Sequence, residues 1–236
     1  MKKLLLPVIL LVSFAFTGSD PCDGNDFFMK GTTAKTGYYK ADGTMTGSGT
    51  SEVTNVYTAG DSTVAIVHTD FSKADAPDDH HPSDLKLACV DGSFVMDMSD
   101  AIRSVTAAAM EGMKFICTGT QVGYKQSYTV GDKLDSVCMV METNMNGMVM
   151  GKSTVTIYDR LVESYQDLVV PAGTFKCYRI SYMTKGVTYM HGNPYPSNPH
   201  KSALYYCPKI GVVRMEQYSG DQLFSYSQFL SITKPN

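Results

Sequence analysis

Short runs in which apolar and polar residues alternate dominate the chain, and turn residues separate them. Ranges 35–40, 51–59 and 62–71 alternate in this way, with Asp42-Gly43 and Gly60-Asp61 between them. Alternation with a period of two, bounded by Gly and Asp, predicts β-strands joined by turns. This part of the chain is therefore expected to form a three-strand meander.

Two dipeptides predict tight hairpins, because Asp-Gly and Asn-Gly favour two-residue type I′ turns. Asp91-Gly92 joins strands expected at 85–91 and 93–98. Asn146-Gly147 joins strands expected at 137–144 and 148–157, which places Met145 opposite Met148. One face of that hairpin then carries Val137 and a methionine surface formed by Met139, Met141, Met145, Met148 and Met150. The other face is expected to carry Val140, Val149, Val155 and Ile157.

Further strands are expected along the rest of the chain, at 113–118, 175–184, 203–207, 211–218 and 222–232. The charged segment 72–83 and the proline-containing segment 186–200 interrupt the alternation, so both are predicted to be loops. The pattern thus predicts about 10 to 12 strands.

One segment shows helical periodicity, over 99–111. Ser99 or Asp100 suits the N-cap, and Gly112 follows its end. Its single apolar stripe must be buried, and it consists of Ile102, Val105, Ala109 and Met113. Consecutive strands joined by short turns form antiparallel sheets, and a large sheet curls because its strands twist. The predicted fold is mainly β, a curved antiparallel sheet wrapped on one short helix.

The N-terminus predicts export. Residues 1–19 have a positive start, an apolar run too short to span a membrane and small residues for cleavage, as a signal peptide has. Residues 20–236 are then a single domain, periplasmic or extracellular. A lipoprotein acylated at Cys22 is the alternative, but Asp20 and Pro21 do not fit the small residues that acylation needs. We expect no transmembrane segment beyond the leader.

Composition narrows the function. The formal net charge of the chain is −3, and its sequence contains no run of basic residues, so no nucleic-acid partner is expected. The chain has no Trp but 15 Tyr and 15 Met, and its apolar β-branched and aromatic residues suit many short strands.

Six cysteines in an oxidising compartment favour disulfides, and no C-x-x-C is present. If the strands flanking 187–201 pair, Cys177 and Cys207 lie nearly opposite, so a disulfide between them is predicted. Buried free thiols are the alternative.

Neither metal chemistry nor catalysis is predicted. Segment 75–82 gathers three carboxylates with His80 and His81, but its spacing matches no EF-hand or zinc motif. A solvated acidic loop is the simpler interpretation. The five histidines accompany no nucleophile signature, so we expect no enzyme and no cofactor.

Several segments resemble the TapB-like secreted proteins of Bacteroidota. They are 168–182, 205–216, 39–43, 87–98 and the methionine-rich hairpin. The resemblance implies a curved antiparallel half-barrel similar to the lipoprotein carriers LolA and LolB, and no established activity. Tyr205 stands where that family tends to have Trp, and Pro208, which cannot donate to a β-ladder, precedes Lys209.

The methionine surface is the most suggestive functional feature. Flexible, polarisable methionines adapt to apolar ligands of different shapes, so a curled sheet lined by them could hold an acyl chain. The same side chains could instead pack beneath the helix, or touch a partner at the hairpin tip. The leading hypothesis is a non-enzymatic binding protein with an apolar or lipid-like ligand. The alternative is a structural or interaction module of the cell envelope with a filled core.

Overall fold

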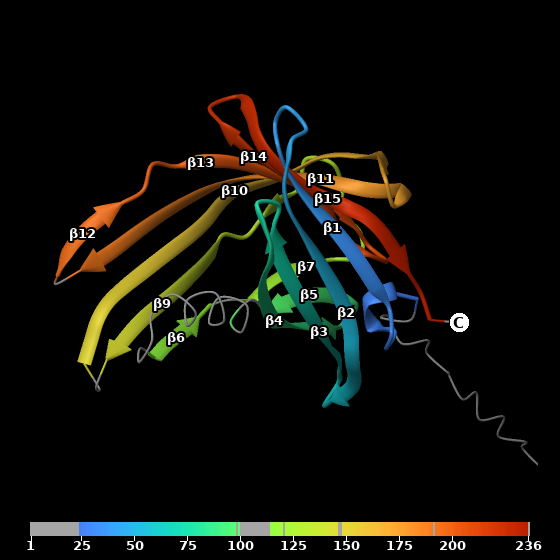
Figure 1. The fold of residues 1–236 in the computed structure, drawn as a ribbon, viewed down its shortest axis with the longest axis horizontal. Coiled ribbons are helices and arrows are strands. Elements are labelled where there is room, and N and C mark those ends of the chain that lie inside the picture. Colours follow the sequence, from blue (N-terminus) through green and yellow to red (C-terminus); the bar gives the residue numbers. More distant parts are fainter. Residues whose placement is uncertain are drawn as a thin grey trace, which may run out of the picture.

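The computed structural model describes residues 24–97, 99, 114–119, 121–145, 148–190 and 192–235. In this part of the chain a 3₁₀ turn, η1 (Asp26–Phe28), precedes a single 15-stranded antiparallel sheet (Figure 1). The strands are β1 (Thr33–Lys40), β2 (Met45–Ala59), β3 (Ser62–Lys73), β4 (Ala76–Val90), β5 (Ser93–Asp97), β6 (Lys114–Thr118), β7 (Gln121–Tyr124), β8 (Lys133–Leu134), β9 (Val137–Met145), β10 (Met148–Val170), β11 (Gly173–Met190), β12 (Asn193–Pro196), β13 (His200–Cys207), β14 (Gly211–Ser219) and β15 (Gln222–Thr233). The predicted signal peptide lies outside the described residues, as does the predicted helix apart from Ser99.

The predicted meander and hairpins are confirmed. Strands β1, β2 and β3 pair in succession. Val90 pairs with Ser93 across Asp91-Gly92, and both turn residues have positive φ, 49° and 72°. That geometry is what a type I′ turn requires, and it explains why the dipeptide predicted the turn correctly. Met145 likewise pairs with Met148.

Two segments predicted to be loops are strands instead. The range 76–83 belongs to β4, where His81 pairs with Phe71 of β3. The range 186–190 continues β11, and β12 folds back on it. These strand ends extend past the main core, so their hydrogen-bonded ladders continue without apolar alternation. Hydropathy therefore gave no sign of them.

Strand β10 is 23 residues long, whereas the alternation predicted a strand ending at 157. Its register with β11 shifts between Tyr158 and Leu161 and again between Val162 and Ser164. Each bulge adds an unpaired residue and breaks the period of two. The sequence pattern consequently looked interrupted where the strand continues.

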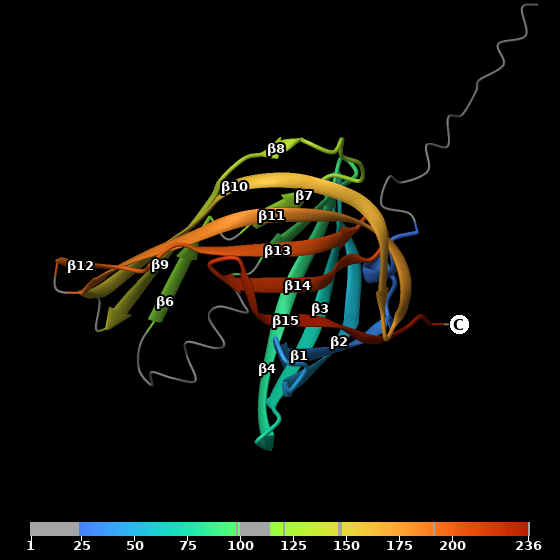
Figure 2. The same cartoon turned by 90° about the horizontal axis from the view of Figure 1, so that it is seen from above.

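The strand order is β6-β9-β10-β11-β13-β14-β15-β1-β2-β3-β4-β5-β7, and the sheet is not closed. Pairing of β1 with β15 joins the two halves of the chain in the middle of the sheet. Strand β6 is the first in this order and β7 is the last, yet only residues 119 and 120 separate them in sequence. The sheet must therefore bend until its two edges approach each other, and Figures 1 and 2 show this curvature.

The core lies on the inner side of the bend. Rings from strands that are far apart in the sheet order meet there: Phe94 of β5 and Tyr124 of β7 lie 6.2 and 4.9 Å, centroid to centroid, from Tyr206 of β13. Val67 of β3 and Ile180 of β11 are buried in the same cluster. Burial of this apolar surface is what stabilises the curled sheet, at roughly 25 cal/mol per Å².

Candidate ligand-binding site

The inner faces of β1 to β4 carry cross-strand rows of side chains that change in character along the strands. Residues that pair across antiparallel strands point to the same face, so the register defines the rows. From the core outward they are Val53–Val67–Leu85, then Ser51–Thr69–Ser83, then Thr36–Gly49–Phe71–His81, and last Tyr38–Gly47–Lys73. The face thus passes from aliphatic to hydroxyl, to aromatic and finally to a cation.

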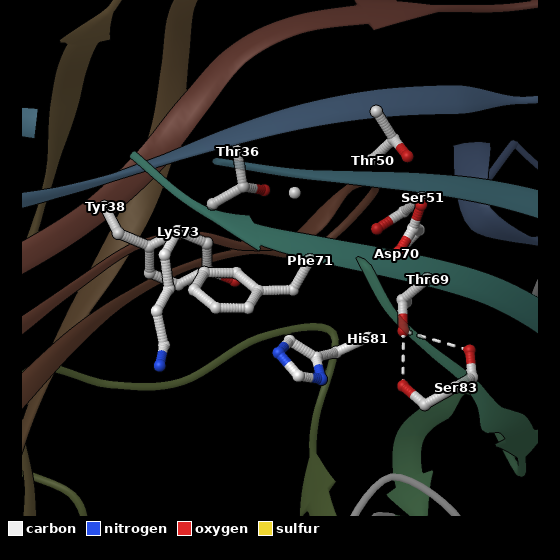
Figure 3. A pocket seen from close by; sticks show the side chains of 11 residues that line it. Thr36, Tyr38, Thr50, Ser51, Thr69, Asp70, Phe71, Lys73, His81 and Ser83 are labelled. Atoms are coloured by element: carbon white, nitrogen blue, oxygen red, sulfur yellow. Dashed lines mark hydrogen bonds between the residues drawn. The ribbon is translucent and has the colours of Figure 1, made fainter. Parts of the chain in front are cut away.

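Two adjoining cavities occupy this face. An inner cavity of about 130 Å³ has apolar walls that include Val67, Leu85 and Phe229. An outer cavity of about 590 Å³ extends over the hydroxyl and aromatic rows (Figure 3). Both are lined by Ser51 and Thr69, so the two cavities adjoin along the hydroxyl row, and together they are named the trough.

An aromatic wall bounds the outer cavity. The rings of Tyr38 and Phe71 meet edge to face at 5.2 Å and 89°, and His81 stacks on Phe71 at 6.3 Å. A Cβ atom at Gly47 would lie 2.7 Å from the carbonyl oxygen of Ser72 and 2.8 Å from the Phe71 ring, so glycine is required there. Partial burial raises the pKa of the Tyr38 phenol above its ordinary value.

Only some of the polar groups in the trough interact with one another. The Thr69 hydroxyl lies 2.7 Å from the Ser83 hydroxyl and donates to the Ser83 carbonyl at 3.0 Å (Figure 3). The Lys73 ammonium, beside Tyr38 and Phe71 in Figure 3, makes no ion pair within the described residues. The outer end of the trough therefore offers a cation, an imidazole and hydroxyls to a polar group.

The acidic segment is distributed over both faces of β4. On the face opposite the trough, His80 Nδ1 lies 2.7 Å from an Asp70 oxygen, and His68 Nδ1 lies 2.9 Å from Asp84. His81, on the trough face, lies 3.3 Å from Asp79. Among the residues that the structure describes, no group of three or more His, Cys, Asp or Glu is close enough to hold a metal ion.

The methionine surface divides into two parts. Met139 and Met141 are half-buried on the core-facing side of β9. The hairpin-tip methionines, Met145, Met148 and Met150, are 39, 66 and 38% exposed. None of the five borders the trough.

One detail of the predicted methionine hairpin was wrong. The register shifts between Val149 and Gly151, so Val155 pairs with Met139 and Ile157 with Val137. Val155 and Ile157 therefore share the face of these residues instead of lying on the opposite one. The bulge adds a residue at Met150, and this reverses the phase of the alternation.

The predicted disulfide is present. Cys177 and Cys207 are bonded across β11 and β13, with their Cα atoms 4.3 Å apart. Cys89 is also disulfide-bonded. Cys117, partly buried on β6, and Cys138, exposed on β9, are free thiols.

A family model described as DUF3108-like matches residues 29–229, which is most of the chain. The chain belongs to the DUF3108-like family. No curated protein matches it. No helix among the described residues is long and apolar enough to cross a membrane.

Two crystal structures are similar to this DUF3108-like chain in fold. One is of a protein from Bacteroides fragilis described as exported and as having a YmcC-like fold, with 21% identity and a TM-score of 0.65 over 89% of this chain and 100% of that one. The other is of a protein from Parabacteroides distasonis described as a lipoprotein, with 20% identity and a TM-score of 0.67 over 88% and 99%. At such identities the likeness establishes the fold alone.

Sequence reasoning missed the trough of this DUF3108-like protein. Its walls include Phe71 and His81, at the border of the segment predicted to be a loop. The glycines of β2 were a signal that could have indicated it, because glycine inside a strand often marks the close approach of another group. Gly47 and Gly49 sit under Phe71 and Tyr38 in this way.

Proposed function

We propose that this chain is an exported, non-enzymatic binding protein that holds an amphiphilic, lipid-like ligand in the trough on β1 to β4. Export is supported by the leader-like N-terminal sequence and by the descriptions of the two similar structures as an exported protein and a lipoprotein. The curled, unclosed sheet is compatible with the half-barrel of LolA and LolB that the resemblance to TapB-like proteins implies.

The observation that carries this proposal is the trough, in which an apolar inner cavity adjoins an outer cavity that holds hydroxyls, an imidazole and a cation. An acyl chain gains free energy by leaving water for the inner cavity, at about 0.8 kcal/mol per buried CH₂. The polar end of the same molecule would lie in the outer cavity, near Lys73 and His81. The order of the rows, from aliphatic to cationic, matches a ligand with one apolar and one polar or anionic end.

The methionine surface supplies a second contact in this proposal. Met139 and Met141 lie on the core-facing side of the sheet, although they do not border the trough. Their flexible thioethers would pack against the part of a long ligand that extends beyond the trough. Met145, Met148 and Met150, at the exposed tip, would contact a ligand or membrane surface during transfer.

A cavity-filling variant tests the proposal. A Cβ added at Gly49 would lie 3.4 Å from the Asp70 carbonyl oxygen and 3.7 Å from the Tyr38 ring, which is ordinary contact, and the side chain of Gly49→Val would occupy space on the trough face. Ser48→Val, on the exposed opposite face of β2, is the matched control. We expect Gly49→Val to weaken binding of a hydrophobic fluorescent dye about tenfold, or 1.4 kcal/mol. Ser48→Val should leave it unchanged.

Native mass spectrometry of the protein purified from its own envelope gives an independent measurement. A co-purifying lipid that is depleted in Gly49→Val supports the proposal. Absence of any lipid, together with dye binding that is equal in both variants, would overturn it.

A structural or interaction module of the cell envelope is the second candidate. Exposed apolar side chains that gather favour it, since such patches mark interaction sites. Met148 and Val149 at the start of β10 and Met190 at the end of the paired β11 are 66, 59 and 53% exposed. Cross-linking in intact cells that is lost in Val149→Ser, with no change in Gly49→Val, would favour this second function.

A further inference from the structure

Arg160 lies in the first bulge of β10, at the open seam of the sheet. The register of β10 with β11 passes from Tyr158 opposite Met183 directly to Leu161 opposite Ser181. Asp159, in the bulge, has a φ of 51°, which is uncommon for a residue other than glycine. Bulges redirect side chains, and here the Arg160 guanidinium lies 5.8 Å from the ring centre of Tyr124 on β7. Arg160 thus bridges the two ends of the strand order.

The charge of Arg160 is buried, and no carboxylate among the described residues forms an ion pair with it. The residue is 6% exposed. Its Nη1 donates to the Asp135 carbonyl oxygen at 2.9 Å, and its guanidinium makes no ion pair within the described residues. Charged groups are rarely buried unless they are paired, because desolvation is costly. The Asp135 carbonyl oxygen, the Tyr124 ring and a hydrogen bond with the Tyr124 hydroxyl compensate only part of that cost.

A cavity of about 330 Å³ adjoins this guanidinium, and its lining residues come from β5 and β7 on one side and from β8, β9 and β10 on the other. Lys125 and Lys133 also line it, and neither is in an ion pair within the part of the chain that the structure describes. Asp135 lines it as well, and the Asp132 carboxylate nearby accepts a hydrogen bond from the backbone N–H of Thr129 at 2.8 Å. Three cations against two carboxylates leave the seam net positive.

We propose that this seam cavity binds an oxyanion, a phosphate or carboxylate group, with Arg160 as its principal ligand. The planar guanidinium can donate two parallel hydrogen bonds to such a group, and the low-dielectric surroundings strengthen them. Lys133 and Lys125 add positive charge at the cavity wall. The oxyanion is a free ion or the headgroup of an anionic amphiphile. The site is separate from the trough and does not depend on the proposed function.

Thermal denaturation of the full mature protein tests the site. Ligands that bind only the folded state raise Tm, so inorganic phosphate is compared with chloride at equal ionic strength. The variant is Arg160→Met, which removes the charge but keeps most of the volume. Lys185→Gln is the control, because Lys185 is exposed and lies over the Tyr158 ring, outside the seam cavity. Dodecyl phosphate and dodecanol form the second pair of probes.

Phosphate should raise the Tm of the wild type and of Lys185→Gln equally, and should raise the Tm of Arg160→Met very little. The affinity of Arg160→Met for phosphate should be at least about tenfold weaker than that of the wild type. If only dodecyl phosphate does so, and dodecanol does not, the oxyanion is the headgroup of an amphiphile. If Arg160→Met does not fold, Arg160→Lys, which keeps the charge and loses the fork, should bind with intermediate affinity. Stabilisation that is absent in the wild type, or unchanged in the Arg160 variant, would overturn the proposal.

Discussion

The rings of Tyr124 and Tyr206 stack at 4.9 Å with an interplanar angle of 21°. The contact joins the edge strand β7 to the central strand β13 across the inside of the curled sheet. Tyr206 is fully buried, and its hydroxyl makes no hydrogen bond to any residue that the structure describes. Its ring therefore stabilises the fold, while its hydroxyl carries an uncompensated desolvation cost.

Replacement of Tyr206 by Phe is expected to leave the free energy of unfolding unchanged or to raise it by up to about 1 kcal/mol. Tyr206→Ala should lower it by about 3–5 kcal/mol, as for other large aromatic truncations. Tyr218→Phe is the control, because the Tyr218 hydroxyl donates a hydrogen bond to Glu216 at 2.6 Å. This variant should lose about 1–2 kcal/mol of its free energy of unfolding. Urea denaturation measures all three. A clear loss in Tyr206→Phe would show that its hydroxyl is bonded.

Alkaline pH should destabilise the protein. Burial raises the pKa of Tyr124 and of Tyr206 above the ordinary value near 10, and it raises the pKa of Tyr128 and Tyr182 as well. Below pH 10 these phenols are neutral in both states. Above it the unfolded chain ionises first and binds fewer protons, so the free energy of unfolding falls, by up to about 1.4 kcal/mol per pH unit for each such tyrosine.

Urea denaturation at pH 8 and at pH 10.5 checks this, alongside tyrosinate absorbance. A fraction of the 15 tyrosines should ionise only as the protein unfolds. The double variant Tyr124→Phe/Tyr206→Phe should show a shallower decline. Stability that is equal at both pH values would contradict the expectation.

Loss of the disulfide should be costly. It joins Cys177 to Cys207, 30 residues apart, so its removal releases the unfolded chain from a loop of that length. The double variant Cys177→Ser/Cys207→Ser should lose about 3–4 kcal/mol. Cys138→Ser, at an exposed free thiol, should change stability by less than about 0.5 kcal/mol. Peptide mapping without reduction detects the bond, and separate alkylated peptides would refute it.

The Glu216 carboxylate accepts hydrogen bonds at the centre of a polar network, on the face of the sheet that points away from the core. This buried carboxylate accepts from Arg214 Nε at 2.9 Å and lies 3.6 Å from Arg179, which also pairs with Glu163. Glu216→Ala should cost about 2–4 kcal/mol, because it leaves partly buried guanidinium groups with fewer partners.

The matched control for this variant is Glu142→Ala. Glu142 pairs with Lys152 at 3.4 Å on an exposed part of the sheet, and such pairs contribute less than about 1 kcal/mol. Urea denaturation of both variants should give clearly different losses. Equal losses would show that the network around Glu216 contributes no more than a surface ion pair.

Much of the strand pattern could be predicted because its signals are local. Asp91-Gly92 and the residues that flank it specify a turn without reference to the rest of the fold. The pairing of Cys177 with Cys207 followed from the register of neighbouring strands. Each of these inferences needed only adjacent elements.

Features that lack a local apolar pattern, or that depend on distant strands, could not be predicted in the same way. His81 and Phe71 form a cavity wall only because β3 and β4 extend beyond the core as a hairpin. Arg160 meets Tyr124 only because the sheet curls until its edges approach. The phase error at Met150 had a weak local signal in Gly151, whose missing Cβ would lie 3.2 Å from the Tyr189 carbonyl oxygen.

The pairing of β1 with β15 has a consequence for the order of assembly. Strands β2 to β5 and strands β9 to β14 can each form hairpins as they are synthesised. The two groups join only when β1 pairs with β15, which lies almost 200 positions later in the chain. Long-range contacts of this kind slow folding. We therefore expect β15 to insert last, between β14 and β1. While a ribosome or translocon still holds β15, these two parts of the sheet cannot join.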